Sequence, residues 1–136
     1  MVAAAATSDA SAVKPLYERS APLEQKIHDV ATQVYGAAAV AFKPAARTRL
    51  QQFSAQGLGH LPVCIAKTQY SFSDDPKLIG APSGWTLSVT DATLSAGAGF
   101  VVAIAGSMML MPGLGKTPQA HKLDVDPAGN IIGMEY

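Results

Sequence analysis

The first apolar pattern in the chain has the period of an α-helix. Its apolar positions recur three or four residues apart and so share one helical face: Leu23, Ile27, Val30 and Val34. Upstream of them, Ser20 is suited to the N-cap and Pro22 to the first helical position. Gly36 follows the last apolar position, where helices commonly end. We therefore predict a helix of about four turns that ends before Gly36.

A second helix is predicted to begin at Pro44. Ala46, Leu50 and Phe53 fall on one face of it, and the pattern ends at the Gly-Leu-Gly of residues 57–59. Because proline lacks an amide hydrogen, it fits the first turn of a helix and not its interior. The first half of the chain is therefore predicted to be helical.

The later patterns are those of β-strands. Residues 61–66 and 100–105 are continuous apolar runs, which is typical of strands covered on both faces. Residues 85–89 alternate instead, with Trp85, Leu87 and Val89 on one side. Residues 124–133 have the form of a hairpin whose turn is at 126–130. The sum predicts an α/β fold: one small domain with two N-terminal helices, a short and mostly parallel sheet, and a C-terminal hairpin.

Length and composition narrow this picture further. The chain has 136 residues, which is enough for one domain with a core. Residues 1–13 form a low-complexity Ala/Ser tail without the apolar stretch of a secretory signal, so the domain is expected to span residues 14–136.

The charge balance and the apolar runs exclude several classes of partner. Ten basic and ten acidic side chains cancel, so nothing favours a nucleic acid or an anionic membrane surface. The longest apolar run, residues 100–105, is far shorter than the roughly 20 residues of a membrane span. The single cysteine, Cys64, excludes an internal disulfide and suits an intracellular reducing compartment, either the cytoplasm or an organelle matrix.

A polar run follows the first predicted strand and raises the question of a ligand site. Its members are Lys67, Thr68, Gln69 and Tyr70. Either the strand simply reaches the surface there, or its end presents polar groups to a ligand cleft. Asp74 and Asp75, just before a proline, are expected to cap a turn.

Other reactive residue types give weaker signals. Cys64 lies inside an apolar run and is expected to be buried and unreactive. His28, His60 and His121 lack the spacing of a metal site. The Gly-rich segments 95–99 and 113–116 lack the signatures of a P-loop or a dinucleotide-binding fold, so tight turns are expected. The first of them is also compatible with close approach to a phosphate.

Five segments together resemble the C-terminal end of formate–tetrahydrofolate ligase (10-formyltetrahydrofolate synthetase). They are LPVCIAKTQYSFSDDP from residue 61, GAPSGWTLSV from residue 80, SAGAGF from residue 95, MPGL from residue 111 and DVDPAGNIIG from residue 124. The helical segment PLEQKIHDVATQVYGA is similar to the helix that precedes this region in the family. The resemblance covers residues 14–136.

The resemblance implies an ATP-dependent reaction in which formate forms formyl phosphate and tetrahydrofolate then accepts the formyl group. It also implies that ten residues border or shape the ligand cleft of the whole enzyme: Lys67, Thr68, Gln69, Tyr70, Gly80, Ala81, Pro82, Ser95, Gly97 and Gly99. No catalytic residue and no metal ligand is implied for this chain.

The phosphate-binding parts belong to the N-terminal portion of the family. ATP and tetrahydrofolate are therefore implied for the whole enzyme, and this chain alone is expected to bind neither and to be inactive. A protein partner is expected, either the catalytic ligase portion or a larger assembly.

Two departures from the family keep an alternative open. Thr90 and Thr93 stand where the family usually has arginines. The loss of two cations beside a Gly-rich loop is expected in a domain retained for its shape. The chain could thus be a non-catalytic accessory subunit of a larger complex, derived from this domain.

Overall fold

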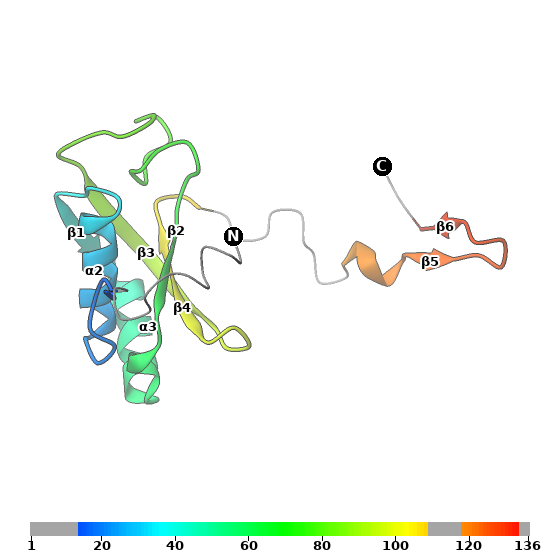
Figure 1. Cartoon of the computed structure of the whole chain (residues 1–136), viewed down its shortest axis with the longest axis horizontal. Helices are drawn as coiled ribbons and strands as arrows, with labels where there is room; N and C mark the ends of the chain where they lie inside the picture. The colour runs from blue at the N-terminus through cyan, green and yellow to red at the C-terminus, as the bar shows by residue number, and fades with distance from the viewer. Residues whose placement is uncertain (1–13, 109–117, 134–136) are drawn as a thin grey trace, which may run out of the picture.

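A computed structural model of the protein describes residues 14–108 and 118–133. The Ala/Ser tail and the predicted turn at residues 113–116 lie outside the described residues. The helices and strands are labelled in Figure 1 and have these bounds: α2 (Leu23–Gln33), β1 (Ala39–Phe42), α3 (Pro44–Ala55), β2 (Val63–Ala66), β3 (Thr86–Ser95), β4 (Phe100–Ala105), β5 (Asp124–Val125) and β6 (Ile131–Ile132).

The sheet has four strands in the order β1-β3-β4-β2. β1 pairs parallel with β3, and β2 pairs parallel with β4. β3 and β4 are antiparallel because a tight turn at residues 96–99 joins them. These pairings and the C-terminal hairpin confirm the predicted α/β fold class. Strand β1, which lies between the two helices, was missed because its four residues are too short for a clear pattern.

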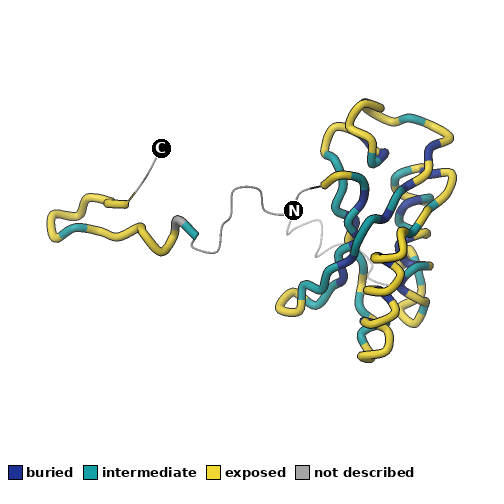
Figure 2. The backbone as a smooth tube through the Cα atoms, turned by 180° about the vertical axis from the view of Figure 1, so that it is seen from behind, coloured by how far each residue is buried: buried dark blue, intermediate teal, exposed yellow. Residues whose placement is uncertain are grey.

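Both helices cover the same face of the sheet (Figure 1). The alternation predicted for residues 85–89 is correct, since the side chains of Trp85, Leu87 and Val89 are buried. Helix α3 begins at Pro44 as predicted and buries Ala46, Leu50 and Phe53. Figure 2 shows the buried residues gathered where the helices meet the sheet.

No helix in the described part of the chain covers the other face of the sheet, which corrects the prediction for two strands. β4 alternates between buried and half-buried residues, and Ile65 is the one buried residue of β2. Cys64 points to the open face and is exposed, so the prediction of a buried thiol was wrong. A short apolar run does not reveal how many faces of a strand are covered, because the covering layer lies elsewhere in the sequence.

The N-terminal helix also differs from its prediction in two respects. Pro22 is the N-cap residue, the helix begins at Leu23, and no side chain caps it. Val34 lies beyond the last helical turn and is exposed, whereas Lys26 is fully buried. The Lys26 ammonium donates hydrogen bonds to the carbonyl oxygens of Gly59 at 2.8 Å and Leu61 at 3.0 Å. Loss of hydration, with a smaller effect of Arg19, lowers the pKa of Lys26.

The C-terminal hairpin forms around Asp126, as predicted. The Asp126 carboxylate accepts hydrogen bonds from the backbone amides of Ala128 and Asn130 at 2.9 and 2.8 Å. It also accepts one from the Asn130 side chain at 2.9 Å, and these bonds lower its pKa. The hairpin is exposed along almost its whole length (Figure 2).

Within the described residues, no helix has both the length and the apolar character that a membrane span requires.

Candidate functional site

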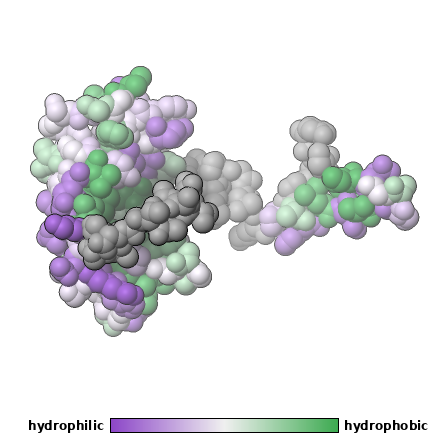
Figure 3. Space-filling model, in the orientation of Figure 1, coloured by the Kyte–Doolittle hydropathy of each residue, from purple (hydrophilic) through white to green (hydrophobic). Residues whose placement is uncertain are grey.

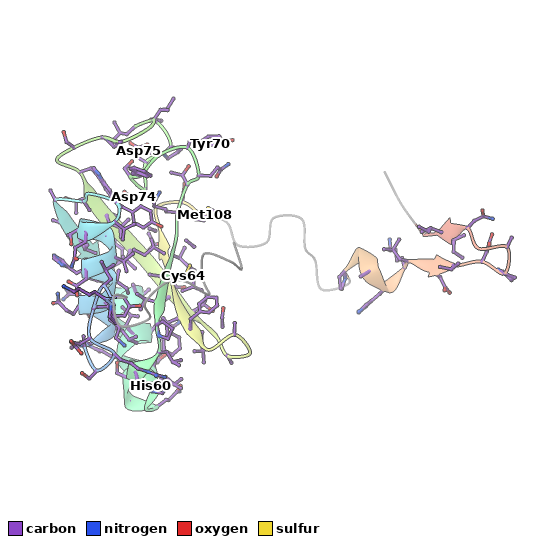
Figure 4. The ribbon with its side chains drawn as sticks, viewed as in Figure 1. His60, Cys64, Tyr70, Asp74, Asp75 and Met108 are labelled. Carbon is purple, nitrogen blue, oxygen red and sulfur yellow. The ribbon has the colours of Figure 1, made fainter. Side chains whose placement is uncertain are left out.

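A cavity of about 420 Å³ lies where the chain leaves the C-terminal end of strand β2. Six of the ten predicted cleft residues line it, together with Tyr35, Ser71 and Phe72; the six are Lys67, Thr68, Gln69, Tyr70, Gly80 and Ala81. Figure 4 labels Tyr70, Asp74 and Asp75 in this loop region above the sheet. The structure therefore brings together two segments of the sequence that were predicted to border one cleft.

Backbone hydrogen bonds hold the two walls of the cavity together. The Phe72 amide donates to the Gly80 carbonyl at 2.8 Å, and the Gly80 amide donates to the Tyr70 carbonyl at 3.1 Å. Ser71 and Gly80 thus form an isolated parallel bridge. Gly80 has a φ of 81°, a conformation that glycine adopts without strain.

Two buried serines stabilise the loop beneath the cavity. The hydroxyls of Ser71 and Ser73 are 2.9 Å apart, and the Ser71 oxygen also accepts from the Ser73 amide at 3.0 Å. The Ser73 hydroxyl donates to the Asp75 carbonyl at 3.2 Å. Because buried hydroxyls that lack partners are costly, this network favours one loop conformation.

Lys67 uses its ammonium group within the loop. The ammonium donates to the carbonyl oxygens of Thr68, at 3.3 Å, and Ser71. It also lies 4.7 Å from the centroid of the Tyr35 ring, a cation–π distance. Loss of hydration lowers the pKa of Lys67, and the Asp74 charge opposes this effect. Lys67 therefore shapes the cavity more than it offers a free charge to a ligand.

Three aromatic side chains, those of Tyr35, Tyr70 and Phe72, are part of the cavity wall. Tyr70 and Phe72 are 64% and 50% exposed, so their rings are accessible from solvent. The rings of Tyr35 and Phe72 lie 6.2 Å apart in a tilted arrangement. Such a wall can contact a planar ring, and Lys67 is the only charged side chain among the lining residues.

The predicted turn cap is confirmed for Asp75 but not for Asp74, which anchors the loop to the sheet instead. Asp75 accepts a hydrogen bond from the Lys77 amide at 2.9 Å. Asp74 accepts one from the Ser88 amide of β3 at 3.0 Å. The backbone of Asp74 also packs closely against Gly106, just after β4, and a smaller cavity of about 130 Å³ lies beside it.

The remaining predicted residues do not join the cavity. Pro82 lies just beyond its lining. Ser95, Gly97 and Gly99 form the turn between β3 and β4, which is at the opposite end of the sheet from the end of β2. In that turn the Ser95 carbonyl accepts from the Gly99 amide at 2.8 Å, and Gly99 has a φ of 72°.

Thr90 and Thr93, which the resemblance predicts to stand in place of arginines, lie on the sheet. The Thr90 hydroxyl donates to the carbonyls of Ile104 at 3.1 Å and Gly106 at 3.4 Å, across an irregularity in the β3–β4 pairing. Thr93 lies opposite Val102. Thr90 is therefore engaged by the backbone of its own sheet.

No sequence pattern predicts that Tyr35 and Phe72 complete the aromatic wall. Tyr35 follows a helix that is distant in sequence, and Phe72 is one aromatic residue in a polar loop. In the described residues, no three His, Cys, Asp or Glu side chains approach one another closely enough to hold a metal ion.

The fold and the cavity define the class of the protein: a two-layer α/β domain with an aromatic, nearly uncharged pocket at the end of a parallel strand. Comparison with known proteins identifies the family. The family described as formate–tetrahydrofolate ligase matches residues 1–135. The chain belongs to the formate–tetrahydrofolate ligase family.

Individual ligases give the same result. The formate–tetrahydrofolate ligase of Pseudothermotoga lettingae is 50% identical over 127 residues, which is 93% of this chain and 23% of the relative. The ligase of Saccharopolyspora erythraea is 53% identical over 88% of this chain, which is 21% of its own length. The ligase of Staphylococcus aureus (strain JH9) is 50% identical over 89% of this chain, which is 22% of its own length. The chain thus spans less than a quarter of the length of these relatives.

Proposed function

We propose that this chain contributes one wall of the ligand cleft of a formate–tetrahydrofolate ligase, in which ATP and formate formylate tetrahydrofolate. The observation that carries the proposal is the cavity at the end of β2, where residues from two family-like segments meet. Ligand sites of α/β proteins commonly lie at the C-terminal ends of parallel strands. A separate portion of a ligase would supply the phosphate-binding parts.

The chemistry of the cavity favours contact with a ring and not with a phosphate. Tyr70, Phe72 and Tyr35 offer aromatic surface, which suits the planar groups of either a folate or a nucleotide. The Lys67 ammonium is already engaged by backbone carbonyls and by an aromatic ring. The free chain is accordingly expected to show no formate-dependent ATP hydrolysis and no formyl transfer.

The test uses a chimera in which this chain replaces the matched part of the Pseudothermotoga lettingae ligase. Calorimetric titration measures ATP and tetrahydrofolate binding, with and without Tyr70→Ala. We expect the affinity for one of the two ligands to fall about two- to tenfold, the range that the loss of one aromatic contact gives. A Ser95→Ala chimera tests whether the turn at the other end of the sheet also borders the cleft.

The titrations distinguish an error about the cavity from an error about the function as a whole. A chimera that binds both ligands with unchanged affinity when Tyr70 is truncated would show that the cavity is not part of the cleft. A folded chimera that binds neither ligand would refute the proposed function as a whole.

A second candidate function is that of a non-catalytic accessory subunit, and Thr90 and Thr93 favour it. The Thr90 hydroxyl is bound within the sheet, so this position provides neither a cation nor a free donor. If this candidate is right, the folded chimera will lack formylation activity, and the pair Thr90→Arg and Thr93→Arg will increase it. Full activity without these arginines would exclude it.

A further inference from the structure

Two apolar surfaces are not covered by any helix within residues 14–108 and 118–133. The first is the open face of the sheet, where Phe100, Val102 and Ile104 of β4 alternate with buried residues. Cys64 lies beside Val102 in the parallel register, and Ala66 lies beside Ile104. Because all of these side chains point away from the helices, they form one continuous apolar area, which we call the open-face patch.

The open-face patch offers almost no charge to a partner. Asp91 lies opposite Ile104 at its border, and the Arg49 guanidinium is 3.8 Å from the Asp91 carboxylate. Thr93 and Ser95 continue the border with uncharged groups. A surface of this kind is suited to an apolar protein surface, since a charged partner would lose hydration without gaining a counter-charge.

The second surface is one face of the C-terminal hairpin. Val125 and Ile131 are direct partners across the hairpin, so their side chains share a face, and Leu123 lies two residues before Val125. These three residues are 60%, 66% and 44% exposed. Figure 3 shows hydrophobic residues along this part of the chain, and Figure 1 shows that the hairpin stands apart from the sheet.

The hairpin is too short to be stable on its own. Its strands have two residues each, and isolated hairpins are marginally stable in water even when they are longer. The Asp126 turn specifies the local conformation, but it buries no apolar surface. The apolar hairpin face therefore requires a surface to pack against.

We propose that the open-face patch and the apolar hairpin face are two parts of one interface, and that its occupant is the portion of a formate–tetrahydrofolate ligase that this sequence does not include. This inference rests on the proposed function. The match covers 88–93% of this chain but only 21–23% of three ligases, so in those relatives the same surfaces occur within a polypeptide more than four times as long. Whether that portion belongs to the same polypeptide or to a separate chain, it meets both surfaces.

Cys64 provides the readout, because it is the only cysteine of the chain and it lies in the open-face patch. Its labelling by a maleimide is compared between the free chain and the Pseudothermotoga lettingae chimera, with a Cys64→Ser chimera as the blank for other thiols. We expect labelling to be at least about tenfold slower in the chimera, since a covered thiol reacts only after local opening. Equal rates in a chimera with a cooperative urea transition would overturn the proposal.

The hairpin half of the interface is tested by substitutions on its two faces. Val125→Asp and Ile131→Asp should lower the urea midpoint of the chimera and leave that of the free chain unchanged. Ile132→Asp is the matched control, because Ile132 is also exposed but pairs with Asp124 on the opposite face. If all three variants lower the midpoint equally, or none does, the assigned face is wrong.

Labelling of Cys64 in the free chain would reveal a different occupant of the two surfaces. If Cys64 is already protected there and Val125→Asp exposes it, the hairpin covers its own sheet and the proposal fails. Protection in a chain that sediments as a dimer would assign the surface to a second copy and would also overturn it. Failure of the chimera to fold counts against the interface if a second chimera with the Saccharopolyspora erythraea ligase fails too. A chimera in which Cys64 is protected but neither ATP nor tetrahydrofolate binds refutes the proposed function alone.

Discussion

Gly106 allows the cavity loop to rest on the sheet, and replacing it should detach that loop. Gly106 has a φ of 64°, and a Cβ built on it would lie 2.6 Å from the Asp74 carbonyl oxygen. Gly99 is a natural control because its φ is 72° and nothing lies within 4 Å of its added Cβ. The two alanine variants thus share a strained backbone conformation and differ in the contact with Asp74.

The expected loss in the free energy of unfolding differs between the two variants. An alanine held in the left-handed region costs about 1–2 kcal/mol, which is the full effect expected for Gly99→Ala. Gly106→Ala adds a clash with a backbone atom, and overpacking of this kind typically costs a further 1–3 kcal/mol or so. We therefore expect Gly106→Ala to lower the free energy of unfolding by about 2–5 kcal/mol.

Two measurements check this expectation. Urea midpoints, with m-values shown to be unchanged, rank the two variants against the parent chain. Hydrogen exchange then locates the damage, because the Ser88 amide donates to the Asp74 carboxylate. Faster exchange at Ser88 is expected in Gly106→Ala and not in Gly99→Ala. Equal midpoints for the two variants would refute the view that Asp74 and Gly106 are in essential contact.

Three further predictions follow from single residues. Cys64 should react with a thiol reagent in the native free chain as fast as in urea, because it is exposed; a requirement for denaturant would contradict the structure. The pKa of Lys26 is lowered below 10.5 by burial, so the unfolded chain binds more protons, and stability should rise as the pH increases toward 10.5. Lys26→Met should flatten that rise in urea midpoints, and an identical pH dependence would exclude Lys26 as a source of it. Trp85→Phe should change the free energy of unfolding by less than about 1 kcal/mol. The reason is that it removes the indole nitrogen, the one buried side-chain polar atom without a partner among the described residues. A loss as large as that of Trp85→Ala would contradict this.

The parts of the fold that could be predicted are those encoded by neighbouring residues. Pro44 starts α3 because its ring fits a first turn, and the 85–89 alternation fixes which side of β3 is buried. The Asp126 turn is specified by its own hydrogen bonds. Each of these features depends on contacts within a few residues, so the sequence displays it directly.

The features that could not be predicted depend on distant contacts. Lys26 occupies a buried position because carbonyl groups from the segment before β2 satisfy its ammonium. Cys64 is exposed because none of the described helices covers its face of the sheet. Polarity assigns the wrong environment to both residues, since burial is decided by what packs nearby and not by the side chain alone.

The candidate site shows the same division between local and distant information. The family resemblance predicted that residues 67–70 and 80–81 border one ligand cleft, which stays a prediction. They line one cavity in the structure, and a backbone bridge between Ser71 and Gly80 accounts for their proximity. The aromatic character of the cavity could not be predicted, because Tyr35 reaches it from the end of a helix.

The properties of the cavity also indicate how the work of a ligase would be divided. Transfer of a phosphoryl group requires cations or backbone amides directed at the developing charge. Here the cation in the cavity is held by its own loop, and the Thr90 hydroxyl is held by its own sheet. What this chain offers is shape and aromatic surface at the end of a rigid strand. If the proposed interface is right, charge stabilisation would come from the portion that covers the open-face patch, and binding of that portion would then complete the site.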